Sequence, residues 1–326
     1  MLNVRTKRDS YFDNAKFILI ILVVFTHFFM GMTEKRGIYE DIYYLLFTIH
    51  MPTFILISGF FSKNIFKDKK CLKKSIHFLW LYVLFQVLYT IFYFITGIDH
   101  SFHLSFLVPE WSLWFLLSMS FWYIGLFVLK KVPPYLAITV SLLLAILVGY
   151  LPEVGRELSL QRAFVFFPYF LIGFHLPKQF FEVFQSKKMK YVGGVALIIL
   201  LFYVVAIDGA NKYWFFGSKA YDDFMDLPEF GALIRLLFYC LSVIGVCGFL
   251  SLVPTKRQWY TDYGKNTLIV YLFHGFIVKL LRQYIPFESL SFIPSIIIFS
   301  FSALFISTLL ATNSIKRATN WIITLF

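Results

Sequence analysis

The sequence is poor in charge and in cysteine. Only 15% of its 326 residues are charged, whereas 59% are hydrophobic and 21% are aromatic. Globular domains carry about 25% charged residues, so an ordinary water-soluble fold is excluded. The three cysteines, Cys71, Cys240 and Cys247, have neither disulfide nor metal-ligand spacing. We therefore expect no metal site, no thiol chemistry and no permanently bound cofactor.

Long polar stretches are also missing, which leaves no room for a separate soluble domain. What is present is a series of apolar runs of about 18 to 20 residues, the length of a helix that crosses a bilayer. Ten such runs lie at residues 15–33, 41–62, 76–97, 112–130, 135–151, 162–177, 191–208, 231–252, 266–284 and 291–312. The sequence therefore predicts an all-α, polytopic helical membrane protein with about ten transmembrane helices, forming one domain over residues 1–326. Prolines near the ends of the fifth and sixth runs leave nine or eleven spans open.

The formal charge of +12 is concentrated in alternate loops between these runs. The largest group follows the second run and consists of Lys63, Lys67, Lys69, Lys70, Lys73 and Lys74. Basic loops of membrane proteins face the cytoplasm, so both termini are predicted to be cytoplasmic. This distribution explains the charge without a nucleic-acid partner. It fits a multi-pass protein of a bacterial plasma membrane that is in contact with membrane lipids.

Two ionisable residues share the first apolar run. Lys16 and His27 are eleven residues apart, which on a helix is about three turns plus 20°, so both lie on one face about 16 Å apart. Placing a histidine side chain inside a bilayer is energetically unfavourable, so a histidine found there is by default a candidate functional residue. His27 is therefore the first candidate catalytic residue.

Two further histidines lie within apolar runs. His50 is followed by Met51-Pro52, and a proline inside a span kinks the helix and releases a backbone carbonyl. By their positions, His27 and His50 lie about 8 and 14 Å below the outer ends of their spans, so they can share one cavity. His274 lies in the ninth run. Each of these histidines can alternatively serve as a structural hydrogen bond between helices.

Other residues suggest ligand contacts near the membrane surfaces. Lysines 63, 67, 70 and 74 would lie on one face of a helix and suit a polyanionic small molecule, although the same pattern is an orientation signal that attracts anionic lipid. On the outer side, Glu110, Trp111 and Trp114, together with the segment 211–216, combine aromatic rings with polar groups, as sugar sites do. Such rings also gather at membrane interfaces. Arg162 and Arg235 lie close to outer span ends, and a structural role fits them as well as a catalytic one.

Several patterns occur in the same order as in the acyltransferase-3 family of integral membrane acyltransferases, which this sequence resembles, most closely in its fucose 4-O-acetylase-like branch. They are Lys16 and His27 with ten residues between them, His50-Met51-Pro52-x-Phe54-x-x-x-Ser58-Gly59, Leu113-Trp114-Phe115-Leu116, the segment from Phe167 to Gly173, and the segment from Gly264 to Leu268 with Tyr271 and His274. Where members often carry an arginine pair, this chain has Lys67, Lys70 and Lys73.

The resemblance implies transfer of an acyl group, most often acetyl, from cytoplasmic acyl-coenzyme A to a hydroxyl of a cell-surface or lipid-linked glycan. His27 would then act as general base or transient acyl carrier, and His50 would orient the acceptor or stabilise the oxyanion. Lys67, Lys70 and Lys73 would hold the nucleotide end of the donor, with Lys16 near the donor's entry. Glu110, Trp111, Trp114, Arg162, Arg235 and His274 are the other candidate substrate-binding residues.

Two other classes of protein fit the same composition. A transporter or flippase of a lipid-linked sugar also needs about ten spans, buried polar residues and aromatic sugar contacts. It would favour inverted repeats with matched broken helices, and no convincing pair is visible. A membrane sensor or scaffold needs no cavity at all.

Overall fold

The computed structural model describes residues 9–35, 37–66, 70–155, 157–206 and 211–324. Within these ranges the chain forms helices and connecting turns, without a strand. The α-helices are α1 (Ser10–Phe29), α2 (Ile38–Phe61), α3 (Cys71–Thr96), α4 (Trp114–Leu129), α5 (Pro134–Leu147), α6 (Leu160–His175), α7 (Lys178–Val183), α8 (Lys187–Ala206), α9 (Lys212–Phe216), α10 (Gly231–Leu252), α11 (Thr267–Tyr284), α12 (Phe292–Leu310) and α13 (Asn313–Ile323). The all-helical prediction is confirmed.

Each of the ten predicted apolar runs coincides with a helix. Among the described residues, six helices are long and apolar enough to cross a membrane: Ser10–Thr33, Ile38–Phe61, Cys71–Thr96, Lys187–Ala206, Pro228–Leu252 and Phe292–Leu310. The helices at Trp114–Leu129 and Pro134–Tyr150 are apolar but shorter. The structure thus supports a multi-pass membrane protein with six candidate spans, while the total of ten and the cytoplasmic termini remain predictions.

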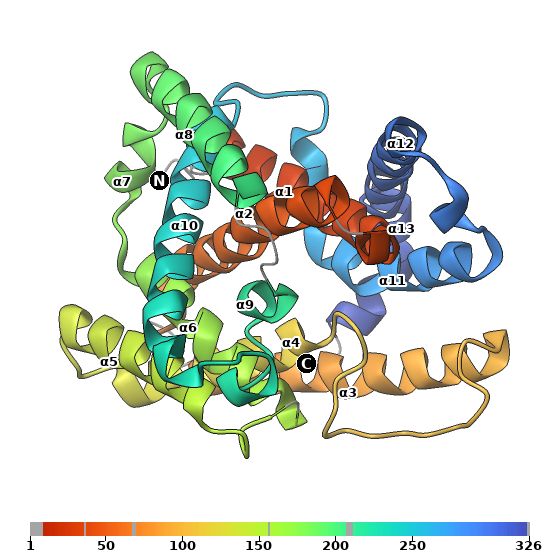
Figure 1. Ribbon diagram of the computed structural model, residues 1–326, viewed down its shortest axis with the longest axis horizontal. Helices are drawn as coiled ribbons and strands as arrows, with labels where there is room; N and C mark the ends of the chain where they lie inside the picture. Colours follow the sequence, from red (N-terminus) through yellow and green to blue (C-terminus); the bar gives the residue numbers. More distant parts are fainter. Residues whose placement is uncertain (1–8, 36, 67–69, 156, 207–210, 325–326) are drawn as a thin grey trace, which may run out of the picture.

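Helices α1 and α2 form the centre of the molecule. Helix α1 packs against α2, α11 and α12, and α2 packs against α6, α8 and α10. Figure 1 shows this pair in the middle, with α8 and α10 on one side and α11 and α12 on the other. Phe12, at the start of α1, stacks on Phe60, at the end of α2, so the two helices run antiparallel. The residues predicted to do chemistry therefore lie on the two most enclosed helices.

The first turns of α1 are fixed by polar contacts. Asp9 caps the helix by accepting a hydrogen bond from the Tyr11 backbone N–H. The buried Asn14 donates to the carbonyl oxygens of Pro254 and Lys256 at 2.7 and 2.9 Å, and its own Oδ1 accepts a bond from Thr261 at 2.6 Å. These bonds tie α1 to the segment before α11, and so fix the position of the histidine that follows on α1.

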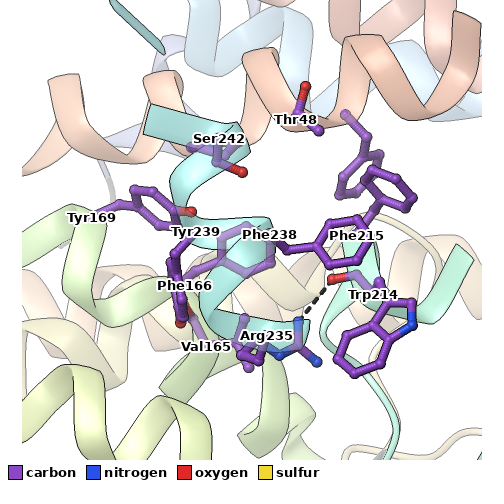
Figure 2. A pocket seen from close by; sticks show the side chains of 12 residues that line it. Thr48, Val165, Phe166, Tyr169, Trp214, Phe215, Arg235, Phe238, Tyr239 and Ser242 are labelled. Carbon is purple, nitrogen blue, oxygen red and sulfur yellow. Dashed lines mark hydrogen bonds between the residues drawn. The ribbon is translucent and has the colours of Figure 1, made fainter. Parts of the chain in front are cut away.

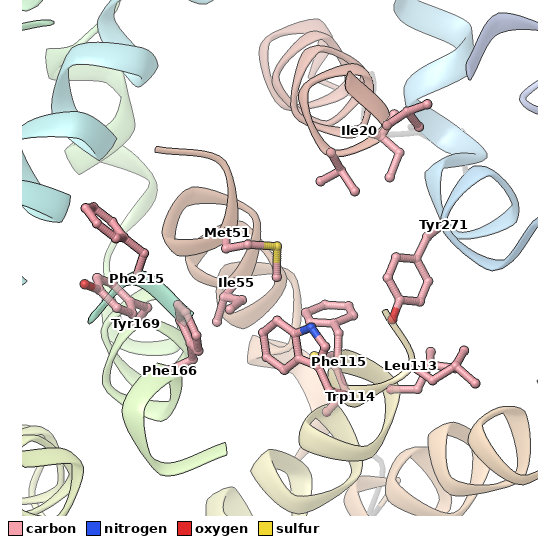
Figure 3. Packing of buried hydrophobic residues seen from close by; sticks show 14 of the residues in the cluster. Ile20, Met51, Ile55, Leu113, Trp114, Phe115, Phe166, Tyr169, Phe215 and Tyr271 are labelled. Atoms are coloured by element: carbon pink, nitrogen blue, oxygen red, sulfur yellow. The ribbon is translucent and has the colours of Figure 1, made fainter. Parts of the chain in front are cut away.

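A core of aromatic and aliphatic side chains joins α2 to its neighbours. Figure 3 shows Met51 and Ile55 of α2 between rings of α4 and rings of α6. Phe115 of α4 contacts Tyr271 of α11 edge to face, with ring centres 5.4 Å apart. This packing surrounds the kinked part of α2, where Pro52 lies inside the helix.

Candidate active site

His27 of α1 and His50 of α2 line the same cavity, as their sequence positions predicted. This histidine cavity has a volume of about 40 Å³. Its walls are formed by Val23, Thr26, His27, Tyr43, Phe47, His50, Met51, Phe54, Ser112, Trp114, Phe115 and Tyr271. Of the predicted ligand-binding residues, Trp114 belongs to it. Two imidazoles in a small, mostly apolar space can move a proton without competition from bulk water.

Two more rings surround His27. Its ring centre lies 4.2 Å from that of Trp111 and 5.2 Å from that of His274 on α11. Trp111 and His274 are themselves 5.5 Å apart, so the three rings form one cluster. Trp111 has a backbone φ of +42°, in the left-handed region that tryptophan rarely adopts. Strained backbone of this kind persists where the surrounding structure needs the side chain in one place.

The tautomers of two histidines follow from their contacts. His50 Nδ1 lies 2.6 Å from the Leu46 carbonyl oxygen, and His274 Nδ1 lies 3.0 and 2.8 Å from the carbonyl oxygens of Val270 and Tyr271. A carbonyl oxygen only accepts, so Nδ1 carries the hydrogen in both rings. In the neutral form, Nε2 of each ring is therefore an acceptor.

Charged residues that the sequence did not single out lie close to this cluster. Arg282 of α11 donates to the backbone carbonyl of His27 at 3.3 Å, and the Lys279 ammonium lies 5.3 Å from the Trp111 ring centre. Lys279 and Arg282 follow His274 by five and eight residues on the same helix, and this spacing is the feature of the sequence that could have identified them. Glu110, a predicted ligand contact, is partly buried beside them. Burial raises the pKa of its carboxyl group, and Lys279 opposes that rise.

A larger cavity of about 340 Å³ lies beyond Trp111. We call it the arginine cavity; it is lined by Met30, Val108, Pro109, Trp111, Gly155, Ser159, Gln161, Arg162, Lys212, Tyr213, Phe216 and Ser218. It brings together the two aromatic segments that the sequence pointed to, around Trp111 and around Tyr213. The Arg162 guanidinium of this cavity lies 5.1 Å from the ring centre of Trp114, which lines the histidine cavity.

A third cavity carries the predicted lysines. This basic cavity, of about 370 Å³, is lined by Ser58, Phe61, Ser62, Ile65, Lys70, Lys74, Met119 and Tyr123. Lys70 and Lys74 also line a neighbouring hollow of about 390 Å³, together with Lys73 and His77. Lys67 lies outside the described residues. Lysines 70 and 73 therefore border adjoining spaces, where several ammonium groups can face one anion.

The three cavities follow one another along the helices. Phe54 and Phe115 line the histidine cavity, and Ser58 and Met119, one turn further on α2 and α4, line the basic cavity. Four residues of helix correspond to about 6 Å. On the other side, Met30 of the arginine cavity follows His27 by three residues. Because α1 and α2 are antiparallel, the basic and arginine cavities lie toward opposite ends of the pair, with His27 and His50 between them.

Lys16 and Arg235 are predicted residues that line none of these three cavities. Lys16 forms an ion pair with Asp13 at 2.9 Å, and its ammonium lies 5.1 Å from the Phe61 ring centre, at the end of α2 that borders the basic cavity. Arg235 is 2% exposed and donates to the Trp214 carbonyl oxygen at 2.7 Å, as Figure 2 shows. It borders a separate space of about 20 Å³ between α2, α6, α9 and α10. The structure does not bring Arg235 to His27.

Among the described residues, no group of three or more histidine, cysteine or acidic side chains is placed to hold a metal ion. No curated protein and no solved structure matches the chain. A family model does match: it is described as an acyltransferase domain, and the match covers residues 9–312. This range contains every cavity and every histidine described above. The chain therefore belongs to the acyltransferase-3 family of membrane acyltransferases.

Proposed function

We propose that this acyltransferase is a membrane O-acyltransferase, of the fucose 4-O-acetylase-like branch, that moves an acetyl or other short acyl group from cytoplasmic acyl-coenzyme A to a hydroxyl of a cell-surface or lipid-linked glycan. The observation that carries the proposal is the row of three cavities, with two histidines in the middle one. A basic space at one end suits an anionic donor. A space rich in aromatic rings at the other end suits a sugar.

The chemistry follows from the position of His27. An unprotonated nitrogen of His27 takes the proton of the acceptor hydroxyl while the hydroxyl oxygen attacks the thioester carbonyl carbon. A C–O bond forms, the C–S bond breaks, and the departing thiolate of coenzyme A receives the proton from His27. In the variant with a covalent intermediate, the unprotonated nitrogen of His27 attacks the thioester carbon and the C–S bond breaks, which releases the thiolate of coenzyme A. The acceptor hydroxyl then attacks the acyl carbon on His27, the C–N bond breaks, and the hydroxyl proton passes to the thiolate.

We assign to His50 only one of the two roles that the sequence left open, which were to orient the acceptor and to stabilise the oxyanion. Its Nδ1 hydrogen is engaged by the Leu46 carbonyl, so the neutral ring offers only the Nε2 lone pair to the cavity. A lone pair can hold a hydroxyl hydrogen but cannot stabilise a negative oxygen. We therefore assign His50 to orienting the acceptor hydroxyl rather than to the oxyanion.

The donor end is formed by the lysines of the basic cavity and its neighbouring hollow. Lys70, Lys73 and Lys74 would hold the phosphates of coenzyme A, with Lys67 as a further candidate, and Lys16 lies near the same end. Each ammonium acts as a point charge on phosphate. The thioester arm would then extend along α2 and α4 toward the histidine cavity, past Phe54 and Phe115.

The acceptor end is the arginine cavity. Trp111 and Tyr213 contribute aromatic rings to its lining, against which a sugar can pack, and Arg162 and Lys212 offer hydrogen-bond donors to the sugar oxygens. Glu110 would act from outside this cavity through Lys279. A cell-envelope saccharide, presented at the outer surface of a bacterial plasma membrane, fits this arrangement.

Acyl transfer from labelled acetyl-coenzyme A tests the proposal directly. The purified protein in detergent or vesicles is offered a crude pool of cell-envelope glycans, beside the variants His27→Ala and His175→Ala. His175 is a matched control because it lies at the end of α6, away from the histidine cavity. We expect label in glycan with the parent and with His175→Ala, but not with His27→Ala. If coenzyme A is neither bound nor consumed while a labelled lipid-linked sugar crosses the membrane, the protein is a transporter.

A further inference from the structure

We propose that His274 is a positioning residue for His27: its Nε2 accepts the N–H of the His27 imidazole, so that the other nitrogen of His27 presents its lone pair to the acceptor hydroxyl. The catalytic consequence rests on the proposed function. The hydrogen bond itself does not, and it can be measured separately.

The first observation is an unused acceptor. His274 is fully buried, at 0% exposure, and its Nδ1 hydrogen is engaged by two backbone carbonyls. Its Nε2 therefore carries a lone pair, and this buried atom has no hydrogen-bond partner. Leaving a buried acceptor unsatisfied destabilises the folded state. Such atoms are rare in native structures and call for an explanation, for which catalysis is a common one.

The second observation is the distance to a donor. The ring centres of His27 and His274 are 5.2 Å apart, and the ring planes differ by 32°. A ring nitrogen lies about 1.1 Å from its ring centre, so two nitrogens that point at each other across this distance lie about 3 Å apart, the length of a hydrogen bond. Neutral His27 has one N–H to donate and one lone pair to keep.

The neighbouring indole is the other candidate donor, because Trp111 Nε1 is also buried without a partner. Its orientation argues against it. A methyl group on Gly275, the residue after His274, would meet Trp111 at Cζ3 and Cε3. This edge of the indole faces α11, and Nε1 lies on the opposite edge of the ring system. The indole N–H therefore points away from the helix that carries His274, which favours His27 as the donor.

The proton balance of the reaction is unchanged by this bond. When His27 takes the acceptor proton, it becomes an imidazolium with two N–H groups. One of these N–H groups remains hydrogen-bonded to His274 Nε2. The other proton goes to the departing thiolate, and His274 keeps its own hydrogen on Nδ1 throughout. Fixing one N–H in this way selects one tautomer and one ring orientation of His27, which is what a positioned general base requires.

The direct test uses the wild-type protein labelled with ¹⁵N-histidine in detergent micelles. A through-bond ¹⁵N–¹⁵N coupling between the rings of His27 and His274 is expected, assigned by its loss in His27→Asn, and His27 should show a single tautomer. Absence of the coupling, with His27 present as a mixture of tautomers, would overturn the proposal. This measurement needs neither donor nor acceptor, and no His274 variant has to fold.

Kinetics then test the consequence with two substitutions. His274→Phe keeps a ring but removes the acceptor, and His274→Gln places an amide oxygen near the position of Nε2. We expect kcat to fall about 100-fold in the Phe variant, with KM for both substrates within about twofold, and the Gln variant to recover most of kcat. His175→Phe is the control for the substitution itself. Wild-type kcat in a folded His274→Phe variant would refute the positioning role, whereas an intact coupling without any acyl transfer would refute only the proposed function.

Discussion

Gly59 on α2 lies so close to Phe170 on α6 that a methyl group on Gly59 would overlap the Phe170 carbonyl oxygen. Gly173 on α6 stands in the same relation to the Leu56 carbonyl oxygen on α2. Glycines on both helices thus allow the backbones to touch, as small residues do between helices in membranes. The contact holds α2, and with it His50, in place.

Alanine at either position is expected to destabilise the protein. In Gly59→Ala and Gly173→Ala the added methyl group can only be accommodated by moving a backbone, at a cost of about 1–3 kcal/mol. Thermal unfolding in detergent should show a lower Tm for both variants. Gly194→Ala is the matched control, since Gly194 lies inside α8 with no atom within 4 Å of an added methyl group. An equal Tm change in all three variants would contradict the close contact.

Charge reversal in the basic cavity should weaken donor binding. In the double variant Lys70→Glu/Lys74→Glu, the phosphates of acyl-coenzyme A would meet two carboxylates, and we expect KM for the donor to rise about tenfold or more, equivalent to about 1.4 kcal/mol. The effect should shrink as salt is added. Lys187→Glu/Lys188→Glu changes the same charge at exposed positions on α8 and should leave the donor KM unchanged. Equal effects of the two double variants would place the donor elsewhere.

Glu110 is expected to make the stability of the protein pH-dependent. Burial raises the pKa of its carboxyl group above the ordinary value, an effect that Lys279 reduces. A carboxyl with a raised folded-state pKa favours folding at low pH, and this contribution is lost as the pH rises through that pKa. The Tm of Glu110→Gln relative to wild type should therefore increase between pH 4 and pH 8. A difference that stays constant over this range would show that the carboxylate is not disfavoured.

Arg235 is expected to be structural. Its guanidinium donates to the Trp214 carbonyl and lies 5.2 and 5.7 Å from the ring centres of Trp214 and Tyr221. Arg235→Met removes the donor and leaves a buried carbonyl unpaired, at about 1–3 kcal/mol, and Arg235→Lys should not restore the Tm because an ammonium cannot stack as a planar group. Arg257→Met, at an exposed ion pair, is the control. A selective loss of acyl transfer at unchanged Tm would instead assign Arg235 to catalysis.

The helices could be predicted because the length of an apolar run can be counted directly along the sequence. Each predicted run is helical in the structure. The sequence also indicated that His27 and His50 share a depth, since both positions can be counted from span ends. Helix α6, which contains Pro168, and α11, which carries Lys279 and Arg282, do not reach the length and apolarity of the six candidate spans. Counting apolar residues alone does not decide whether such helices cross a bilayer.

The grouping of His274 with His27 was not predictable in the same way. It depends on which helix packs against α1, and no periodicity within one helix contains that information. Trp111 was found as an aromatic residue before a span, but neither its left-handed backbone nor its contact with His27 could be read from the sequence. Arg235 was a candidate substrate-binding residue close to an outer span end, and the structure shows that it donates to a backbone carbonyl of α9. Contacts between segments that are far apart in the sequence can be identified only from the folded structure.

The small size of the histidine cavity has a consequence for the membrane itself. Large spaces approach His27 from both ends, yet the space between them is only about 40 Å³, enough for one or two water molecules. Phe54, Phe115 and Trp114 fill the remainder. A continuous chain of water molecules would let protons cross the membrane along the membrane potential. We expect the small histidine cavity to interrupt such a chain. The residues that surround the histidines are therefore expected to limit proton leakage across the bilayer.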